Sequence, residues 1–192
     1  MNRLSFYIFS VVLIVLGHFD IAEGQSYSNN SKEDNREQMK TQFEQFRQTA
    51  RTDPKKALSA CIDSSFSGPD LWYMVLPDNM DVPEKPFTHV EAVKYADKIL
   101  EPDFIKALMD IDTHILFTAG NYETKPWLIE INGEKSTQNI SAEYKNQELI
   151  LAYQVNVFLD TEDESEVDES QSVYTFVFKR NRLILASIVL AD

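Results

Sequence analysis

The sequence predicts an α+β fold, with helices in the first half of the chain and an antiparallel sheet in the second. Up to about residue 115, apolar residues recur three and four positions apart, which is the spacing of amphipathic helices. Beyond it they alternate with a period of two, which is the spacing of strands with one buried face. This order of helices before strands is typical of α+β folds rather than of alternating α/β folds.

The composition is that of one globular domain. The chain has 192 residues, of which 43% are hydrophobic and 11% aromatic, and such a chain can bury a core. Its net charge of −13 argues against nucleic acid and anionic membranes as partners, since both require a basic surface. The single cysteine, Cys61, excludes a disulfide framework and any multi-cysteine metal site. We therefore expect no metal and no cofactor.

Residues 1–24 have the pattern of a secretory signal peptide. Arg3 supplies a positive start, residues 4–16 form an apolar run, and the small residues Ala22 and Gly24 resemble a cleavage site. The run is shorter than the roughly 20 residues that cross a bilayer. We expect cleavage after Gly24, export to the periplasm or beyond, and no membrane attachment afterwards. An uncleaved membrane anchor is the alternative.

A flexible polar leader is expected at residues 25–34, followed by a single domain over residues 35–192. The first helix is predicted at about residues 33–51, and the spacings of four, three and four between its apolar residues define one buried stripe. These residues are Met39, Phe43, Phe46 and Ala50.

Capping signals place the starts of three further helices. Asp53 can cap a helix whose first residue is Pro54. Thr88 and Glu91 match the two ends of a capping box. Pro102 either begins another helix or kinks the preceding one. Between these helices, residues 70–86 are interpreted as an extended loop.

Strands are predicted from the alternation and from one strong turn signal. Asn132-Gly133 is typical of a two-residue hairpin turn. The last strand is apolar on both faces, so it requires a cover on its second face, which a helix, another strand or a second subunit could supply. The predicted strands span residues 127–131, 134–145, 148–160, 171–180 and 183–190, and an acidic connection lies at residues 160–170.

This order of about three helices and then about four long antiparallel strands resembles the NTF2-like (cystatin-like) superfamily over about residues 33–190. The resemblance implies that the helices fill the concave side of a strongly bent sheet. It also implies that two copies pair through the outer face of the sheet, so a homodimer is expected. The superfamily includes isomerases, dehydratases, ligand carriers and immunity proteins, so the fold by itself does not select a function.

Four residues are candidates for ligand binding. Three aromatic residues could line an apolar pocket, with core filling as the alternative for each. The fourth is a histidine at the junction of helices and sheet, where with Asp110 or Asp112 it could act as a general base, or lie on the surface. No residue is assigned a catalytic role. The candidates are Trp72, Tyr73, His114 and Tyr153.

Three other features have a structural and a functional interpretation. Cys61 is interpreted as a buried, inert thiol rather than a reactive one. His89 and Glu91 could suggest a metal pair, but a helix start explains them better. The acidic connection could bind calcium, although it lacks the spacing of a calcium loop. It is interpreted as a solvated loop that could also dock on a basic protein.

These observations favour an exported binding or interaction protein without catalytic activity. It would hold a small apolar ligand in a cone-shaped pocket, or bind a basic protein partner as an NTF2-like immunity protein does. A small NTF2-like isomerase, dehydratase or hydrolase is the alternative.

Overall fold

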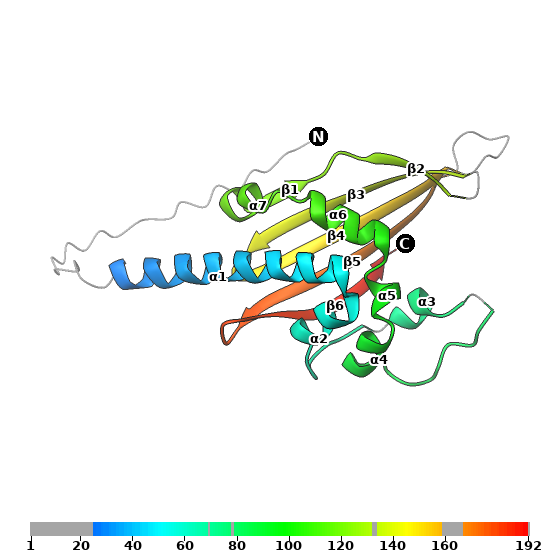
Figure 1. The fold of residues 1–192 in the computed structure, drawn as a ribbon, viewed down its shortest axis with the longest axis horizontal. Coiled ribbons are helices and arrows are strands. Elements are labelled where there is room, and N and C mark those ends of the chain that lie inside the picture. The colour runs from blue at the N-terminus through cyan, green and yellow to red at the C-terminus, as the bar shows by residue number, and fades with distance from the viewer. Residues whose placement is uncertain (1–24, 69, 78, 132–133, 159–166, 192) are drawn as a thin grey trace, which may run out of the picture.

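The computed structural model describes residues 25–191 except 69, 78, 132–133 and 159–166 (Figure 1). The predicted signal peptide, the Asn132-Gly133 turn and most of the acidic connection lie outside these described residues. Within them, helices precede strands, so the α+β class is confirmed. No helix in this part of the chain is both long and apolar enough to cross a membrane.

The described helices and strands outnumber the predicted ones. The helices are α1 (Gln25–Thr52), α2 (Pro54–Cys61), α3 (Leu71–Val75), α4 (His89–Lys94), α5 (Ala96–Ile99), α6 (Pro102–Asp110) and α7 (Thr113–Ala119). The strands are β1 (Asn121–Glu123), β2 (Trp127–Ile131), β3 (Glu134–Lys145), β4 (Glu148–Phe158), β5 (Val167–Lys179) and β6 (Arg182–Ala191).

The predicted helix starts agree with the structure. Asp53 caps α2, where its carboxylate accepts a hydrogen bond from the backbone N–H of Lys56 at 2.9 Å. Thr88 and Glu91 form the predicted capping box of α4. Pro102 begins α6 as a separate helix, so the kinked alternative is wrong.

Helix α1 begins at Gln25, although the sequence predicts a flexible leader over residues 25–34. No glycine or proline lies between Gln25 and Thr52, so no residue of this segment interrupts a helix. An ion pair of 3.4 Å between Glu33 and Arg36, one turn apart, adds modest support to this part of the helix.

Two short helices lie where the sequence predicts none. Helix α3 replaces part of the expected loop over residues 70–86, because Leu71 and Val75, four residues apart, are both buried. Helix α7 occupies residues expected to begin the strand pattern. It is capped at both ends, by the carboxylate of Asp112 and by Gly120, whose φ of 85° is left-handed.

The sheet is antiparallel, in the order β1-β3-β4-β5-β6, with β2 also paired to β3. Strands β1 and β2 are two pieces of one edge, since both pair with β3 and the chain between them contains Pro126, which has no backbone N–H. The β3–β4 and β5–β6 hairpins each turn through two residues with positive φ, as tight hairpins require. These residues are Asn146, Gln147, Arg180 and Asn181.

The helices cover one face of the sheet, and α1 lies across it (Figure 1). Beneath α1 the core is aromatic, with the Phe176 ring of β5 lying 5.1 Å from Phe46 and 6.2 Å from Phe43. Strand β6 is at the edge of the sheet, where Ser67 forms two backbone hydrogen bonds with it. The face of β6 that points away from the helices carries Val189, a residue that is 43% exposed.

Candidate functional site

A cavity of about 490 Å³ lies on the face of the sheet that the helices cover, called the concave face below, between the sheet and the α3–α6 segment. Its floor consists of inward-facing residues on three neighbouring strands, in which Tyr153 of β4 is paired with Ser172 of β5, and Ser172 with Leu190 of β6. Val155 and Ser170 form the next pair of the floor. The roof is formed by Met74 of α3, Asp97 and Lys98 of α5, and Glu101 and Pro102 at the start of α6.

The cavity results from a change of side-chain size along β5. The inward positions Phe178, Phe176 and Tyr174 are large and buried, and Tyr174 stacks on Phe104 of α6 with 4.1 Å between ring centroids. The next two inward positions are Ser172 and Ser170. Because a serine side chain fills much less space than an aromatic ring, the concave face is left open beyond Tyr174.

Tyr153 is the most informative residue of the floor. It is 3% exposed, and its hydroxyl has no hydrogen-bond partner among the described residues. Burial raises the pKa of Tyr153, and the nearby charges of Glu101 and Asp103 raise it further, so the phenol is neutral. A buried hydroxyl without a partner is unfavourable by about 1–3 kcal/mol, so this group favours a ligand or water that can bond to it.

The neighbouring Tyr174 provides a comparison within the same cluster. Its hydroxyl donates a hydrogen bond of 2.8 Å to the carbonyl of Ile99, at the end of α5. Burial raises its pKa as well. Both tyrosines contact Phe104, yet only the hydroxyl of Tyr174 is satisfied by the protein itself.

The roof brings charged groups to the cavity. Its side chains include two carboxylates, Asp97 and Glu101, and one cation, Lys98. The pKa of Glu101 is raised, because the surrounding protein disfavours its charged form and Asp103 lies nearby, while Lys98 acts in the opposite direction. Within the described residues, no ion pair within 4.0 Å involves any of these groups.

Comparisons with known proteins identify one fold neighbour. No protein-family model and no curated protein matches the chain. The structure is similar to that of an NTF2-like protein with a cystatin-like fold from Novosphingobium aromaticivorans. The two are 7% identical, with a TM-score of 0.33, over 90% of this chain and 91% of the other. The site and the function are therefore argued from the residues of this chain.

The four candidate ligand-binding residues do not come together. Tyr153 lines the cavity. Trp72 is buried but does not line the cavity. Its ring lies 4.8 Å from the Phe87 ring, and its indole N–H donates a hydrogen bond of 2.8 Å to the carbonyl of Lys85. Tyr73 is 68% exposed on α3, and His114 is exposed on α7.

The contacts of the other residues considered from the sequence are explained by packing and helix capping. Cys61 is buried under α1, and burial raises its pKa to about 12, so the thiol stays protonated at neutral pH. Glu91 bonds to Thr88 and Lys85 rather than to His89. In the described part of the chain, no group of three or more His, Cys, Asp or Glu residues is placed to hold a metal ion.

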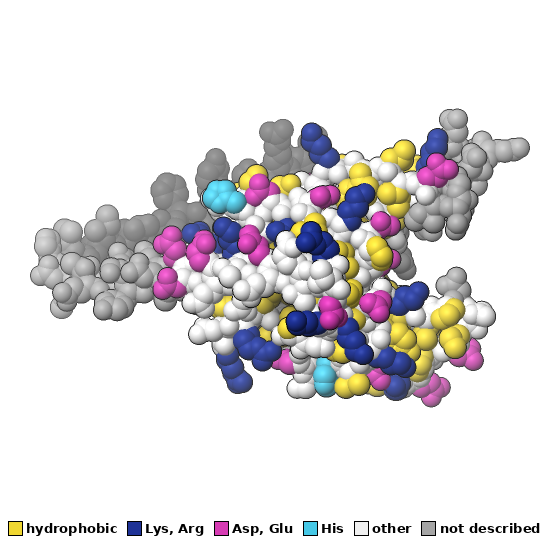
Figure 2. Space-filling view, viewed as in Figure 1, with side chains coloured by type: hydrophobic (Ala, Val, Ile, Leu, Met, Phe, Trp, Pro, Cys, Tyr) yellow, Lys and Arg dark blue, Asp and Glu magenta, His cyan; other side chains and the backbone are white. Residues whose placement is uncertain are grey.

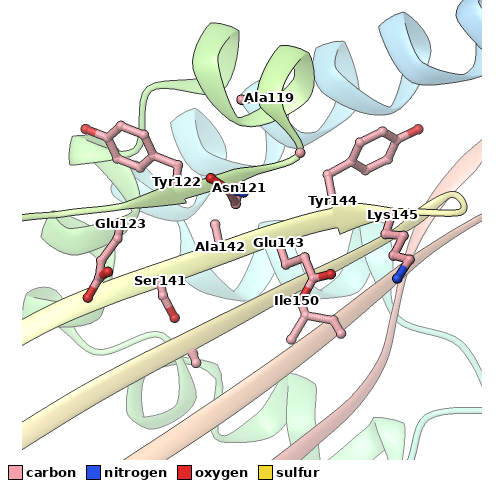
Figure 3. Close-up of a pocket in the computed structure, with 12 residues that line it drawn as sticks. Ala119, Asn121, Tyr122, Glu123, Ser141, Ala142, Glu143, Tyr144, Lys145 and Ile150 are labelled. Atoms are coloured by element: carbon pink, nitrogen blue, oxygen red, sulfur yellow. The ribbon is translucent and has the colours of Figure 1, made fainter.

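A second hollow, of about 690 Å³, lies on the opposite face of the sheet, beside β1 (Figure 3). Figure 3 shows Glu123, Ser141 and Glu143 on one side of the strands, with Tyr122 and Tyr144 pointing to the other side. The carboxylate of Glu123 accepts a hydrogen bond of 3.3 Å from Asn139. No described side chain of this outer hollow has a buried polar atom without a partner. The concave cavity is therefore the candidate site.

Proposed function

We propose that the protein is a non-catalytic binding protein that holds a small molecule in the concave cavity. The observation that carries this proposal is the buried hydroxyl of Tyr153, a residue of the cavity floor, which has no hydrogen-bond partner among the described residues. A ligand that forms a hydrogen bond with it would recover the free energy that its burial costs. The cavity volume of about 490 Å³ is in the usual range for small-molecule sites, which is about 300–1,000 Å³.

The cavity also offers apolar surface for the body of a ligand. Met74 and Pro102 contribute from the roof, and Val155 and Leu190 from the floor. Such a mixture of apolar walls and a few polar groups is common in small-molecule sites. The signal-peptide pattern supports binding outside the cytoplasm. Export, a basic protein partner and pairing through the outer sheet face stay predictions from the sequence.

The proposal is tested by filling the cavity. Native mass spectrometry of the protein purified from its own host, followed by a fragment screen, would identify ligands. Leucine at position 172 would occupy the floor, so Ser172→Leu is expected to abolish ligand binding while the protein stays folded. Ser141→Leu makes the same change in the outer hollow and is the matched control. Binding that survives Ser172→Leu but is lost in Ser141→Leu would overturn the proposal and point to the outer face.

Proton-transfer catalysis is the second candidate, and the raised pKa of Glu101 close to Tyr153 is the observation that favours it. A raised pKa moves a carboxyl towards the pH range in which general acid–base catalysis is efficient. The test is deuterium exchange at the carbon beside the carbonyl in a panel of cyclic ketones, followed by NMR. Catalysis would be supported if the protein accelerates deuterium exchange and Glu101→Gln abolishes the acceleration. An exchange rate equal to that in buffer alone would exclude this reaction for the ketones tested.

A further inference from the structure

We propose that the concave cavity selects a cationic ligand, a small molecule that carries an ammonium group on a compact apolar body. This inference rests on the proposed function, because it names the ligand class of the same cavity. It follows from the kinds of polar group that line the cavity, from their charges and from the buried hydroxyl of Tyr153, which has no partner among the described residues.

Among the polar side chains that line the cavity, Lys98 can only donate hydrogen bonds, while the amide of Gln171 can donate and accept. Two carboxylates of the roof, Asp97 and Glu101, accept only, and the hydroxyls of Tyr153, Ser170 and Ser172 can all accept. A primary ammonium group has three N–H donors and no acceptor, so it complements this set. Tyr153 would accept one of these hydrogen bonds, which would give its buried oxygen the partner that it lacks.

The charges of the roof favour a cation as well. Lys98 is the one positive side chain in the lining, against the carboxylates of Asp97 and Glu101. Asp103 lies close enough to act on both Glu101 and Tyr153. The negative field of the roof thus reaches the floor, and Lys98 forms no ion pair within the described residues that would cancel it. A positive ligand would be stabilised by this field, and because Asp97 and Glu101 are exposed the preference should weaken as salt is added.

An anionic ligand is disfavoured by the start of α6. Helix N-termini attract anions through their free backbone N–H groups. Here the first helical residue is Pro102, which has no N–H, and Asp103 places a carboxylate in the first turn. The helix start that faces the cavity therefore repels anions.

The test compares three probes of one shape that differ in charge: cyclohexylammonium, cyclohexanol and cyclohexanecarboxylate. Their dissociation constants for the full chain would be measured by NMR titration at neutral pH and constant ionic strength. We expect cyclohexylammonium to bind at least about tenfold more tightly than cyclohexanol, and cyclohexanecarboxylate to bind most weakly. Glu101→Gln should remove most of this preference, and Glu123→Gln, the same change on the outer face, should leave it intact.

The outcomes separate this inference from the proposed function. Equal binding of amine and alcohol, lost in Ser172→Leu, would overturn the cation preference and leave the binding function standing. Tighter binding of the carboxylate would overturn it too. Absence of binding by all three probes at millimolar concentration would count against both. An ammonium preference that survives Glu101→Gln and Ser172→Leu would show that the cation binds elsewhere and would overturn the inference.

Discussion

The two ends of the concave face show how one sheet can form both a sealed core and a cavity. At the closed end, under α1, Phe176 of β5 packs against Phe43 and Phe46. At the open end, the same strand presents Ser172, and a cavity lies above it. The pairing of β5 with β4 continues unchanged past both positions, so along this pair the difference follows from side-chain volume. On its other side, the pairing of β5 with β6 shifts register between Thr175 and Phe176. A packed core and an open cavity thus lie along a single strand.

The surfaces of the two ends also differ. Figure 2 shows positive and negative side chains interspersed over the helical face, and apolar atoms gathered at the α3–α4 corner beside the open end. Tyr73, Met80 and Val90 are exposed in this corner. Substitutions made at one end at a time test whether the two ends differ in packing.

The largest effect is expected at the closed end, from Phe176→Ala. The ring is fully buried, and its removal leaves a cavity, so the free energy of unfolding should fall by about 3–5 kcal/mol. Ser172→Ala, at the open end of the same strand, should change it by less than about 0.5 kcal/mol. Urea unfolding of both variants at neutral pH measures this. Equal losses would show that the open end is packed as tightly as the closed end.

A smaller loss is expected from Arg47→Met. The buried Arg47 guanidinium donates hydrogen bonds of 2.8 Å and 2.7 Å to the carbonyls of Leu108 and Ile111, at the end of α6. Without it these carbonyls lose their partner, so we expect a loss of about 2 kcal/mol. Burial lowers the pKa of Arg47, and the nearby charges of Glu44 and Asp112 oppose this shift. Burying the charged guanidinium is therefore itself unfavourable. Arg51→Met, on the exposed side of α1, is the control, and a similar loss there would contradict this explanation.

The strands and capped helices could be predicted from the sequence because their signals are local. The period-two alternation predicted β4 from its correct start, the Asn132-Gly133 turn signal placed the start of β3, and Asp53 and Thr88 marked two helices. Helices α3 and α7 span 5 and 7 residues, too few for a helical period to stand out. Strand β1 has 3 residues and depends on its pairing with β3.

The cavity could not be predicted in the same way, because its lining comes from segments far apart in the chain. Of its residues, only Tyr153 was a candidate from the sequence. One local signal was present, namely the change from Phe176 and Tyr174 to Ser172 and Ser170 at the inward positions of β5. That change shows where packing stops, but not that α3 and α5 form a roof there.

The third prediction concerns the α3–α4 corner beside the open end. Glu91 accepts a hydrogen bond of 2.7 Å from Lys85, and it also bonds to Thr88. These bonds lower its pKa from 4.5 to about 2. Thr88→Ala removes the cap of α4 and should cost about 1 kcal/mol.

The pH dependence follows from the sign of this shift. Because the pKa of Glu91 is lower in the folded protein, its stabilising contribution is fully present above pH 4.5 and is lost as the pH falls towards 2. Glu91→Gln should therefore lower the free energy of unfolding at neutral pH, and the difference from the unmodified protein should shrink over this window. A difference that stays constant from pH 7 to pH 2.5 would refute the assignment.

The smallest effect on stability is expected at Tyr153, the residue on which the proposed binding depends most. Tyr153→Phe removes a buried hydroxyl that has no partner within the described residues, so the free energy of unfolding should stay the same or rise slightly. Tyr174→Phe removes a satisfied hydroxyl and should cost about 1 kcal/mol, since the carbonyl of Ile99 loses its partner. Ligand affinity should change in the opposite order, falling for Tyr153→Phe and persisting for Tyr174→Phe. A tyrosine kept for packing would show no such inversion, so unfolding and binding measured on this pair decide whether the open end is a site or an imperfectly filled core.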